Sequence, residues 1–399
     1  MYKKLLIGSA IAASTLTLQA DQLDDLTTKL NTLTQEIAEL KKQKNAELEV
    51  LTEEIAQIKE TETNGSSAMD KLSFGGYGKM DYTNYRDSST ANELDIYRAI
   101  LYVGYQFTDN IKFVSEIEWE HGGRESTGGY SVIEQAYLDF KLNNMASVKV
   151  GHMIVPVGMV NLYHEPTYFP SVSRPEVEKY IIPSTWHENG AVVHGSINSF
   201  DYQVGLMNGL NATNGTEVRN MRQNGQNAEA EDFAFVARAD YKTNNGINIG
   251  GSIFTGGAGQ ETTTLSSVDT TIAEIHAGYN LNKIHINALY AQSKVDNASA
   301  VAVNANANAS GKGSGYYINA AYAITAKWTP FVQYEKYNRF DEKFDETGTA
   351  TTADKDISNT SIGLNYKPTP NVVLKANYVI RDNKGTDDDR IELGTGYVF

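Results

Sequence analysis

The strongest constraint on this chain is a two-residue period in its sequence. From about Leu72 to Phe399, apolar and polar residues alternate in segments of about ten residues, without a helical period. The last of these segments, Ile391 to Phe399, keeps the alternation up to its final aromatic residue. Side chains at successive positions of a strand point to opposite faces, so each segment predicts a strand with one apolar and one polar face. The pattern therefore predicts an all-β fold.

Two kinds of separator lie between these strands, and they take turns along the chain. The short separators are 108–110, 143–144, 198–199, 243–246, 281–283, 325–326 and 368–370. The long separators are 85–92, 121–129, 154–187, 208–230, 256–270, 295–312, 341–355 and 382–388. Short turns at one end and long loops at the other are typical of a transmembrane β-barrel. Counting through them predicts an antiparallel transmembrane β-barrel of about sixteen strands.

The alternation also separates a lipid-facing phase from an inner phase. If Ile275, Ala277 and Tyr279 face lipid, the same phase places charged residues of the other strands inside. Lys or Arg on the lipid face costs about 2–4 kcal/mol at the middle of the membrane, which explains this segregation. The strand residues predicted to line the interior are Arg98, Glu116, Glu118, Glu120, Asp139, Lys141, Arg238, Lys375, Arg381 and Arg390. We expect a water-filled interior without a packed core. A soluble β-sandwich is the alternative, but it would not need tyrosine at the same end of successive strands.

The third long segment, residues 154–187, is rich in aromatic residues and proline. A loop of this length is uncommon unless it is ordered by its own packing. We expect it to fold into the barrel and to bring its charged side chains to the narrowest point. These constriction candidates are Glu165, Arg174, Glu176, Glu178 and Lys179. An extracellular loop packed on its neighbours or on another subunit is the alternative.

Three segments precede the predicted barrel (72–399). Residues 1–20 place two lysines before a short apolar run and predict a secretory signal peptide, so we expect the chain to be exported. Residues 21–62 carry Leu and Ile at heptad spacing and predict a coiled coil, and the mixture of Leu and Ile at both seam positions favours a homotrimer. One amphipathic helix packed on a domain is the alternative. Residues 63–71 predict a flexible linker.

The composition excludes several classes of function. The chain has no Cys, which removes disulfides, thiolate catalysis and Cys-based zinc sites. Its formal charge of -15 argues against nucleic acid as a partner. Of its 7 His, His276 and His285 flank one short turn, and neither lies in a motif that would mark a nucleophile. We therefore expect no enzymatic activity, no catalytic residue, no cofactor and no metal.

A twelve-residue segment resembles a known family of bacterial outer-membrane porins, the phosphate-selective porins O and P. Residues 148–159 read V-K-V-G-H-M-I-V-P-V-G-M, where the family has the form hydrophobic-x-V-G-Q-x-x-x-P-F-G. His152 replaces the Gln of the family and Val157 the Phe. The preceding strand, Ile133 to Phe140, is also similar. The resemblance covers the barrel and implies a sixteen-stranded trimer in the outer membrane, surrounded by lipid and lipopolysaccharide, whose third long loop narrows the pore. Related trimeric dicarboxylate porins also carry a coiled coil before the barrel.

The resemblance implies a passive channel for small hydrophilic solutes and ions. The alternative is a structural or adhesive surface barrel, in which a periplasmic coiled coil anchors to peptidoglycan and conduction is incidental. Phosphate selectivity in the family rests on a ladder of Arg and on Lys at the constriction. The third loop here carries carboxylates as well as Arg174 and Lys179. Its sequence therefore leaves the sign of the ion preference and the specific solute open.

Overall fold

In the computed structural model of this protein, the described residues are 32, 35–42, 44, 68–86, 90–123 and 128–399. The chain divides into two units, Met1–Lys71 and Leu72–Phe399. In the first unit, residues 35–42 are helical and exposed, and η1 (Ala68–Lys71) is a short 3-10 helix. The predicted signal peptide, most of the predicted coiled coil and most of the predicted linker lie outside the described residues. Within the described residues, no helix is long and apolar enough to cross a membrane.

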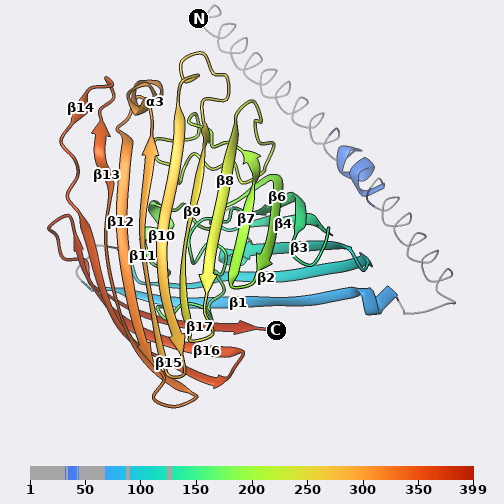
Figure 1. Ribbon diagram of the computed structural model, residues 1–399. Helices are drawn as coiled ribbons and strands as arrows, with labels where there is room; N and C mark the ends of the chain where they lie inside the picture. The colour runs from blue at the N-terminus through green and yellow to red at the C-terminus, as the bar shows by residue number, and fades with distance from the viewer. Residues whose placement is uncertain (1–31, 33–34, 43, 45–67, 87–89, 124–127) are drawn as a thin grey trace, which may run out of the picture. The chain divides into compact units, whose positions relative to one another are not determined.

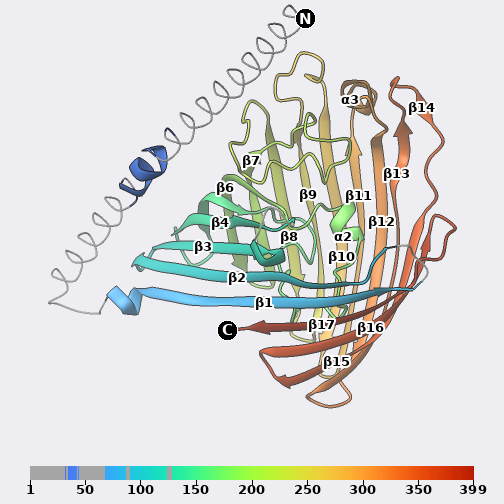
Figure 2. The same cartoon turned by 180° about the vertical axis from the view of Figure 1, so that it is seen from behind.

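The second unit is a closed antiparallel β-barrel, which confirms the predicted fold class (Figures 1 and 2). All 17 strands belong to one sheet, which closes because β1 pairs with both β2 and β17. The two-residue β14 pairs only with β13, so sixteen of the seventeen strands form the wall. The strands are β1 (Leu72–Tyr85), β2 (Glu93–Thr108), β3 (Ile111–Glu120), β4 (Tyr130–Lys141), β5 (Ser147–Ile154), β6 (His187–Ile197), β7 (Phe200–Asn208), β8 (Phe233–Lys242), β9 (Ile247–Gly257), β10 (Asp269–Leu281), β11 (Ile284–Val295), β12 (Ala309–Tyr322), β13 (Trp328–Phe344), β14 (Ala350–Thr351), β15 (Ile357–Thr369), β16 (Val372–Asn383) and β17 (Arg390–Val398).

The connections between strands alternate in length, as predicted. The tight turns after β6 and β10 place Asn198 and Asn282 at φ of 55° and 54°, the left-handed conformation that short hairpin loops require. The loops at the other ends of the strands are long and include η2 (His121–Gly123), α2 (Val177–Tyr180) and α3 (Ala298–Ala305). One end of the barrel is therefore nearly bare, and the other carries all the long loops.

Side chains follow the predicted phase along the wall. Ile275 and Ile362 are among the exposed apolar residues of the outer face, while Glu274 and His276 on either side of Ile275 are buried. Aromatic rings pair near the short-turn end of the barrel, as in Tyr105–Phe107, Phe200–Tyr241 and Trp328–Tyr366. Such rings suit the membrane interface because their bodies are apolar and their polar groups stay wet.

The expectation of an interior without a packed core was wrong. The two loops that follow β5 and β7 bring apolar side chains inside the barrel, where Trp186, Ile181 and Leu210 are fully buried. These loop residues pack with inward-facing strand residues such as Phe254, whose ring centroid lies 4.6 Å from that of Trp186. The strand alternation could not reveal this core, because half of it comes from loops that have no period.

Candidate functional site

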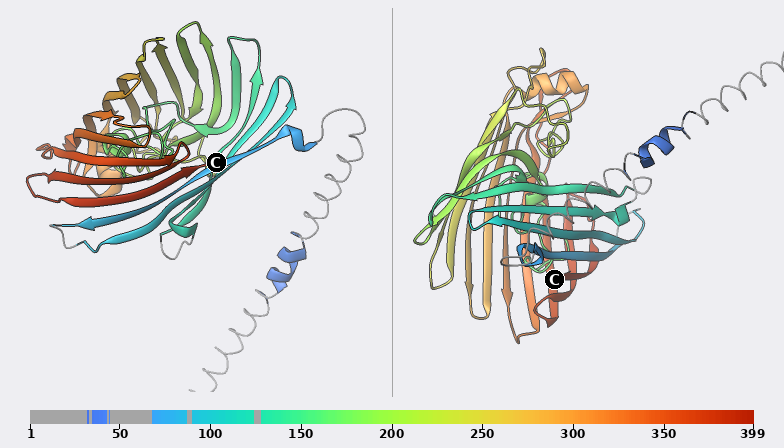
Figure 3. Two further views of the ribbon diagram at one scale, coloured as in Figure 1. Left: turned by 90° about the horizontal axis from the view of Figure 1, so that it is seen from below. Right: turned by 90° about the vertical axis from the view of Figure 1, so that its right-hand side faces the viewer.

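The third long loop, here residues 155–186, crosses the interior of the barrel. From β8, Arg238 Nη1 donates to the Gly158 carbonyl at 2.6 Å. From β16, Lys375 Nζ donates to the carbonyls of Phe169 at 2.6 Å and Ser171 at 2.8 Å. Figure 3 shows the connecting segments inside the ring of strands. Because its partners lie on strands far apart in the sheet, the loop is fixed to opposite parts of the wall.

Two predicted carboxylates of this loop serve as its anchors. Glu176 accepts hydrogen bonds from Tyr337 and Arg381. Burial opposes its ionisation, but Arg381 and Arg390 lower the pKa of Glu176 to about 2. Glu178 accepts from the Tyr317 hydroxyl and from the Val160 amide, both at 2.6 Å. Both carboxylates therefore point at the wall or at the loop's own backbone.

The three glutamates of β3 meet one arginine from β2. Arg98 Nη2 lies 3.2 Å from Glu118 and forms an ion pair with Glu120. The third one, Glu116, accepts from the Gln135 side chain at 2.6 Å and lies 3.6 Å from His164 of the third loop. These residues were predicted from alternation to share the inner face, and the structure brings them together.

The remaining predicted site residues divide into two groups. Arg238 pairs with Asp240 at 2.6 Å, Arg390 with Glu392 at 2.7 Å, and Glu165 accepts from the Tyr102 hydroxyl at 3.2 Å. Asp139 contacts His194 at 3.1 Å, and Lys141 is exposed at the end of β4 beside a short turn. Of these five predicted residues, only Arg390 borders the cavities described next.

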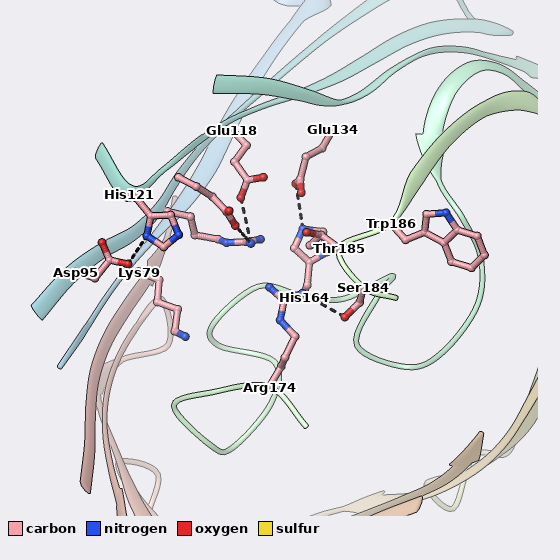
Figure 4. Close-up of polar contacts among 12 residues, drawn as sticks. Lys79, Asp95, Glu118, His121, Glu134, His164, Arg174, Ser184, Thr185 and Trp186 are labelled. Atoms are coloured by element: carbon pink, nitrogen blue, oxygen red, sulfur yellow. Dashed lines mark hydrogen bonds and ion pairs between the residues drawn. The ribbon is translucent and has the colours of Figure 1, made fainter. Parts of the chain in front are cut away.

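Two adjacent cavities open beside the third loop, with volumes of about 230 Å³ and about 300 Å³. Both are lined by Tyr97, Arg98, His121, Arg174 and Lys179. In the first cavity, acids and bases are mixed and largely paired, as in Lys79–Asp81 at 2.5 Å and His121–Asp95 at 2.6 Å. Figure 4 shows Lys79, the His121–Asp95 pair and Arg174 around this region.

The second cavity, hereafter the cationic cavity, has a strong excess of positive charge. Its charged lining consists of Arg98, Arg174, Lys179, Arg219 and Arg222 against Glu120 alone, with His121 and His187 beside them. In the described part of the chain, none of Arg174, Lys179, Arg219 and Arg222 forms an ion pair. Burial and the neighbouring Arg219 lower the pKa of Arg222 to about 9, because a second positive charge is disfavoured there. The cavity is therefore suited to attract anions.

Arg219 and Arg222 were not among the residues predicted from the sequence to line the pore. They lie in the fourth long loop (209–232), which also folds inward: Arg219 Nη1 donates to the Lys179 carbonyl at 2.9 Å, and Arg222 Nη1 to the Pro183 carbonyl at 3.1 Å. Their spacing of three follows neither the strand period nor a known motif. No signal in the sequence could have paired them with the third loop.

A family profile and one relative in sequence match most of the chain. The sequence profile described as phosphate-selective porin O and P matches residues 74–399. An uncharacterized protein of Aquifex aeolicus (strain VF5) is 33% identical over 343 residues, which cover 80% of this chain and 78% of that protein.

Solved porin structures share the architecture at low identity. The anion-selective porin from Comamonas acidovorans is 12% identical with a TM-score of 0.54, covering 82% of this chain and 99% of that chain. Salmonella typhi OmpF in complex with daunomycin is 12% identical with a TM-score of 0.59, covering 82% and 97%. The trimer form of Vibrio cholerae OmpT is 14% identical with a TM-score of 0.54, covering 82% and 99%. At these identities the likeness shows the fold.

Proposed function

Because the chain belongs to the family of phosphate-selective porins O and P and is a passive outer-membrane channel, we propose that this channel prefers small anions, phosphate among them. The family confirms the predicted channel function. The sequence left open whether the channel prefers anions or cations. We infer an anion preference from the charge of the cationic cavity.

The single observation that carries this proposal is the cationic cavity. Four of its basic side chains lack a carboxylate partner among the described residues, and they come from two loops that meet inside the barrel. A low-dielectric wall strengthens the field of such a cluster and raises the local concentration of anions. Arg side chains also match phosphate and carboxylate through paired donors.

The carboxylates that favoured the opposite sign are already engaged. Glu176 neutralises Arg381, Glu178 is held by Tyr317 and the Val160 amide, and Glu188 accepts from the side chains of Trp186 and Asn208. These carboxylates hold the third loop in place, and they do not line the cationic cavity. We propose that this fixed loop forms the narrowest part of the pore.

The proposal is tested by the reversal potential of the purified protein in a planar bilayer under a KCl gradient. We expect the wild type to favour Cl⁻ over K⁺. The double substitution Arg219→Gln, Arg222→Gln should reduce the Cl⁻/K⁺ permeability ratio several-fold, because it removes two uncompensated charges from the cationic cavity. Lys294→Gln is the matched control, since Lys294 is exposed on the outer face and pairs with Asp296.

Phosphate itself provides the second readout. Added to a chloride current, millimolar phosphate should produce block in the wild type that weakens in the double variant. A cation preference in the wild type, or a selectivity equal in the double variant and in Lys294→Gln, would refute the anion path. A folded protein without any conductance would favour a structural or adhesive barrel instead.

Three further parts of the proposal rest on the sequence and the relatives. The heptad seam of residues 21–62 and the trimer form of the Vibrio cholerae relative support a homotrimer whose coiled coil lies in the periplasm, with peptidoglycan as a candidate contact. The outer membrane supplies its lipid and lipopolysaccharide surroundings. We propose no enzymatic activity, in keeping with a family of channels.

A further inference from the structure

We propose that Glu116, Glu134 and His164 form a divalent-cation site, best matched to Zn²⁺, that fastens the third loop to the barrel wall. Glu116 lies on β3, Glu134 on β4 and His164 on the third loop. All three side chains are buried. The inference does not depend on the ion preference of the channel, and it revises the expectation that the chain binds no metal.

The spacing of the three side chains suits an ion of this size. Their nearest ligand atoms all lie within 4.8 Å of one another. His164 Nε2 is 3.3 Å from Glu134 Oε2 and 3.6 Å from Glu116 Oε1. Two Zn²⁺ bonds of about 2.1 Å at a tetrahedral angle separate their ligand atoms by roughly 3.4 Å, so an ion fits between the three groups after small side-chain shifts. Figure 4 shows His164 facing Glu134 across this space.

The carboxylates have unused acceptor capacity. Oε1 of Glu116 and Oε1 of Glu134 are buried and accept no hydrogen bond from the described residues. Each residue is only 1% exposed. A buried carboxylate oxygen without a partner is costly, and the nearby Arg98 is directed at Glu118 and Glu120 instead. A cation at the centre of the three groups would satisfy these oxygens.

Hydrogen bonds with neighbouring groups hold the ligands in place, as they do for the ligands of metal proteins. His164 Nδ1 lies 2.9 Å from the Asn161 carbonyl, so its N–H is committed there and Nε2 is left to face the carboxylates. The Gln135 side chain donates to Oε2 of Glu116 at 2.6 Å and fixes that carboxylate. These contacts orient an imidazole and a carboxylate toward one point.

A β-bulge supplies the remaining ligand. Along β3, Glu116 pairs with Gln135 but the next residue, Ile117, pairs with Ile133, so Glu134 is the extra residue of β4. The side chains of both Glu134 and Gln135 consequently reach the inner face, as their contacts with His164 and Glu116 show. Bulges commonly re-aim a side chain beside a functional site. His164 also lines the first cavity, which gives an ion a route to the site.

A proton is the rival occupant. A protonated His164 could pair with both carboxylates, and although burial lowers the pKa of His164, Glu134 and Glu116 raise it to about 10. The two occupants differ in what can be measured: only the metal site predicts one bound ion per chain with a nitrogen ligand.

The test is a titration of the tag-free, full-length protein in detergent with Zn²⁺ alone, after removal of metals with a chelator. Calorimetry and metal analysis after desalting should give one Zn²⁺ per chain, and X-ray absorption should show one imidazole in an otherwise oxygen shell. Glu134→Gln should weaken binding at least tenfold. Glu116→Gln should do the same and serves in its place if Glu134→Gln does not fold.

Two control variants isolate the site. His152→Gln disrupts the rival pair formed by His152 and His187, whose ring nitrogens lie 2.6 Å apart, and Asp139→Asn removes an inner carboxylate that contacts one histidine. Both controls should keep the wild-type affinity. Absence of stoichiometric Zn²⁺, equal affinity in folded Glu134→Gln and Glu116→Gln, or loss of binding in His152→Gln would overturn the proposal. Binding is read without conductance, so its failure leaves the anion channel untouched.

Discussion

At the scale of single residues, Glu176 and Glu178 show how position decides charge. They stand two positions apart at the short helix α2, yet Glu176 faces two guanidinium groups and Glu178 a hydroxyl and an amide. Burial raises the pKa of Glu178 to about 7, whereas the pKa of Glu176 is lowered to about 2. Glu178 therefore gains or loses its proton near neutral pH, whereas Glu176 stays ionised.

Glu178 should make the stability of the protein depend on pH. Its folded pKa lies above the ordinary value of 4.5, so the folded state holds the proton more tightly than the unfolded state. Its contribution to the free energy of unfolding is fully present below about pH 4.5. This contribution falls by up to roughly 3 kcal/mol as the pH rises through 7. Glu178→Gln should flatten this decline in the thermal midpoint between pH 5 and pH 8. Glu346→Gln, in an exposed loop, should not.

The inward-facing strand residues could be predicted because a two-residue period fixes the face of each side chain. Arg98 and Arg238 were found in this way, and both are buried inside. The contact of Arg238 with Gly158 could not be predicted, and neither could that of Glu116 with His164, because both loop residues belong to a segment whose path is set by contacts distant in sequence. The cationic cavity could not be predicted either, because four of its basic side chains come from two such loops.

At the scale of elements, the third loop behaves as a closed unit with fixed attachments. Its two ends are joined by the Val155 amide, which donates to the Trp186 carbonyl at 3.0 Å, and by Asn161, whose side chain donates to the Val155 carbonyl at 2.8 Å. The alternating pattern predicted the positions of the strands and the length of this loop. The contacts that direct it inward come from its own backbone and from side chains on earlier and later strands of the wall, such as Glu134 of β4, Arg238 of β8 and Lys375 of β16. No local pattern encodes them.

Lys375 is the attachment whose removal should loosen the loop most clearly. Its buried ammonium donates to two loop carbonyls and lies 4.3 Å from the centre of the Phe169 ring. Lys375→Gln leaves at least one buried carbonyl unsatisfied, at a cost of about 1–3 kcal/mol. We expect more frequent current fluctuations in single-channel records, with the barrel still folded. Lys283→Gln, at an exposed short turn, should leave the records unchanged; equal noise in both variants would show that Lys375 does not restrain the loop.

At the scale of the whole molecule, the barrel and the N-terminal segment should be separable. The closed wall satisfies its own strand edges, because β1 pairs with both β2 and β17. Deletion of residues 21–62 should therefore leave a heat-modifiable barrel of unchanged single-channel conductance. If the coiled coil holds the trimer, the deletion should lower the temperature at which trimers dissociate in detergent. An unchanged dissociation temperature would instead favour a role as a spacer or an anchor.

The attachments of the third loop also bear on the order in which parts of the barrel fold. Lys375 reaches the loop across a sequence separation of more than two hundred residues, and Glu392 holds Ser173 across a similar distance. While the wall is being assembled from its first strands, these partners are not yet in place, and long-range contacts form late. The loop can settle only when the last strands arrive. Because β17 carries Glu392 and also closes the sheet against β1, we expect the barrel to close and its filter to form in the same late step.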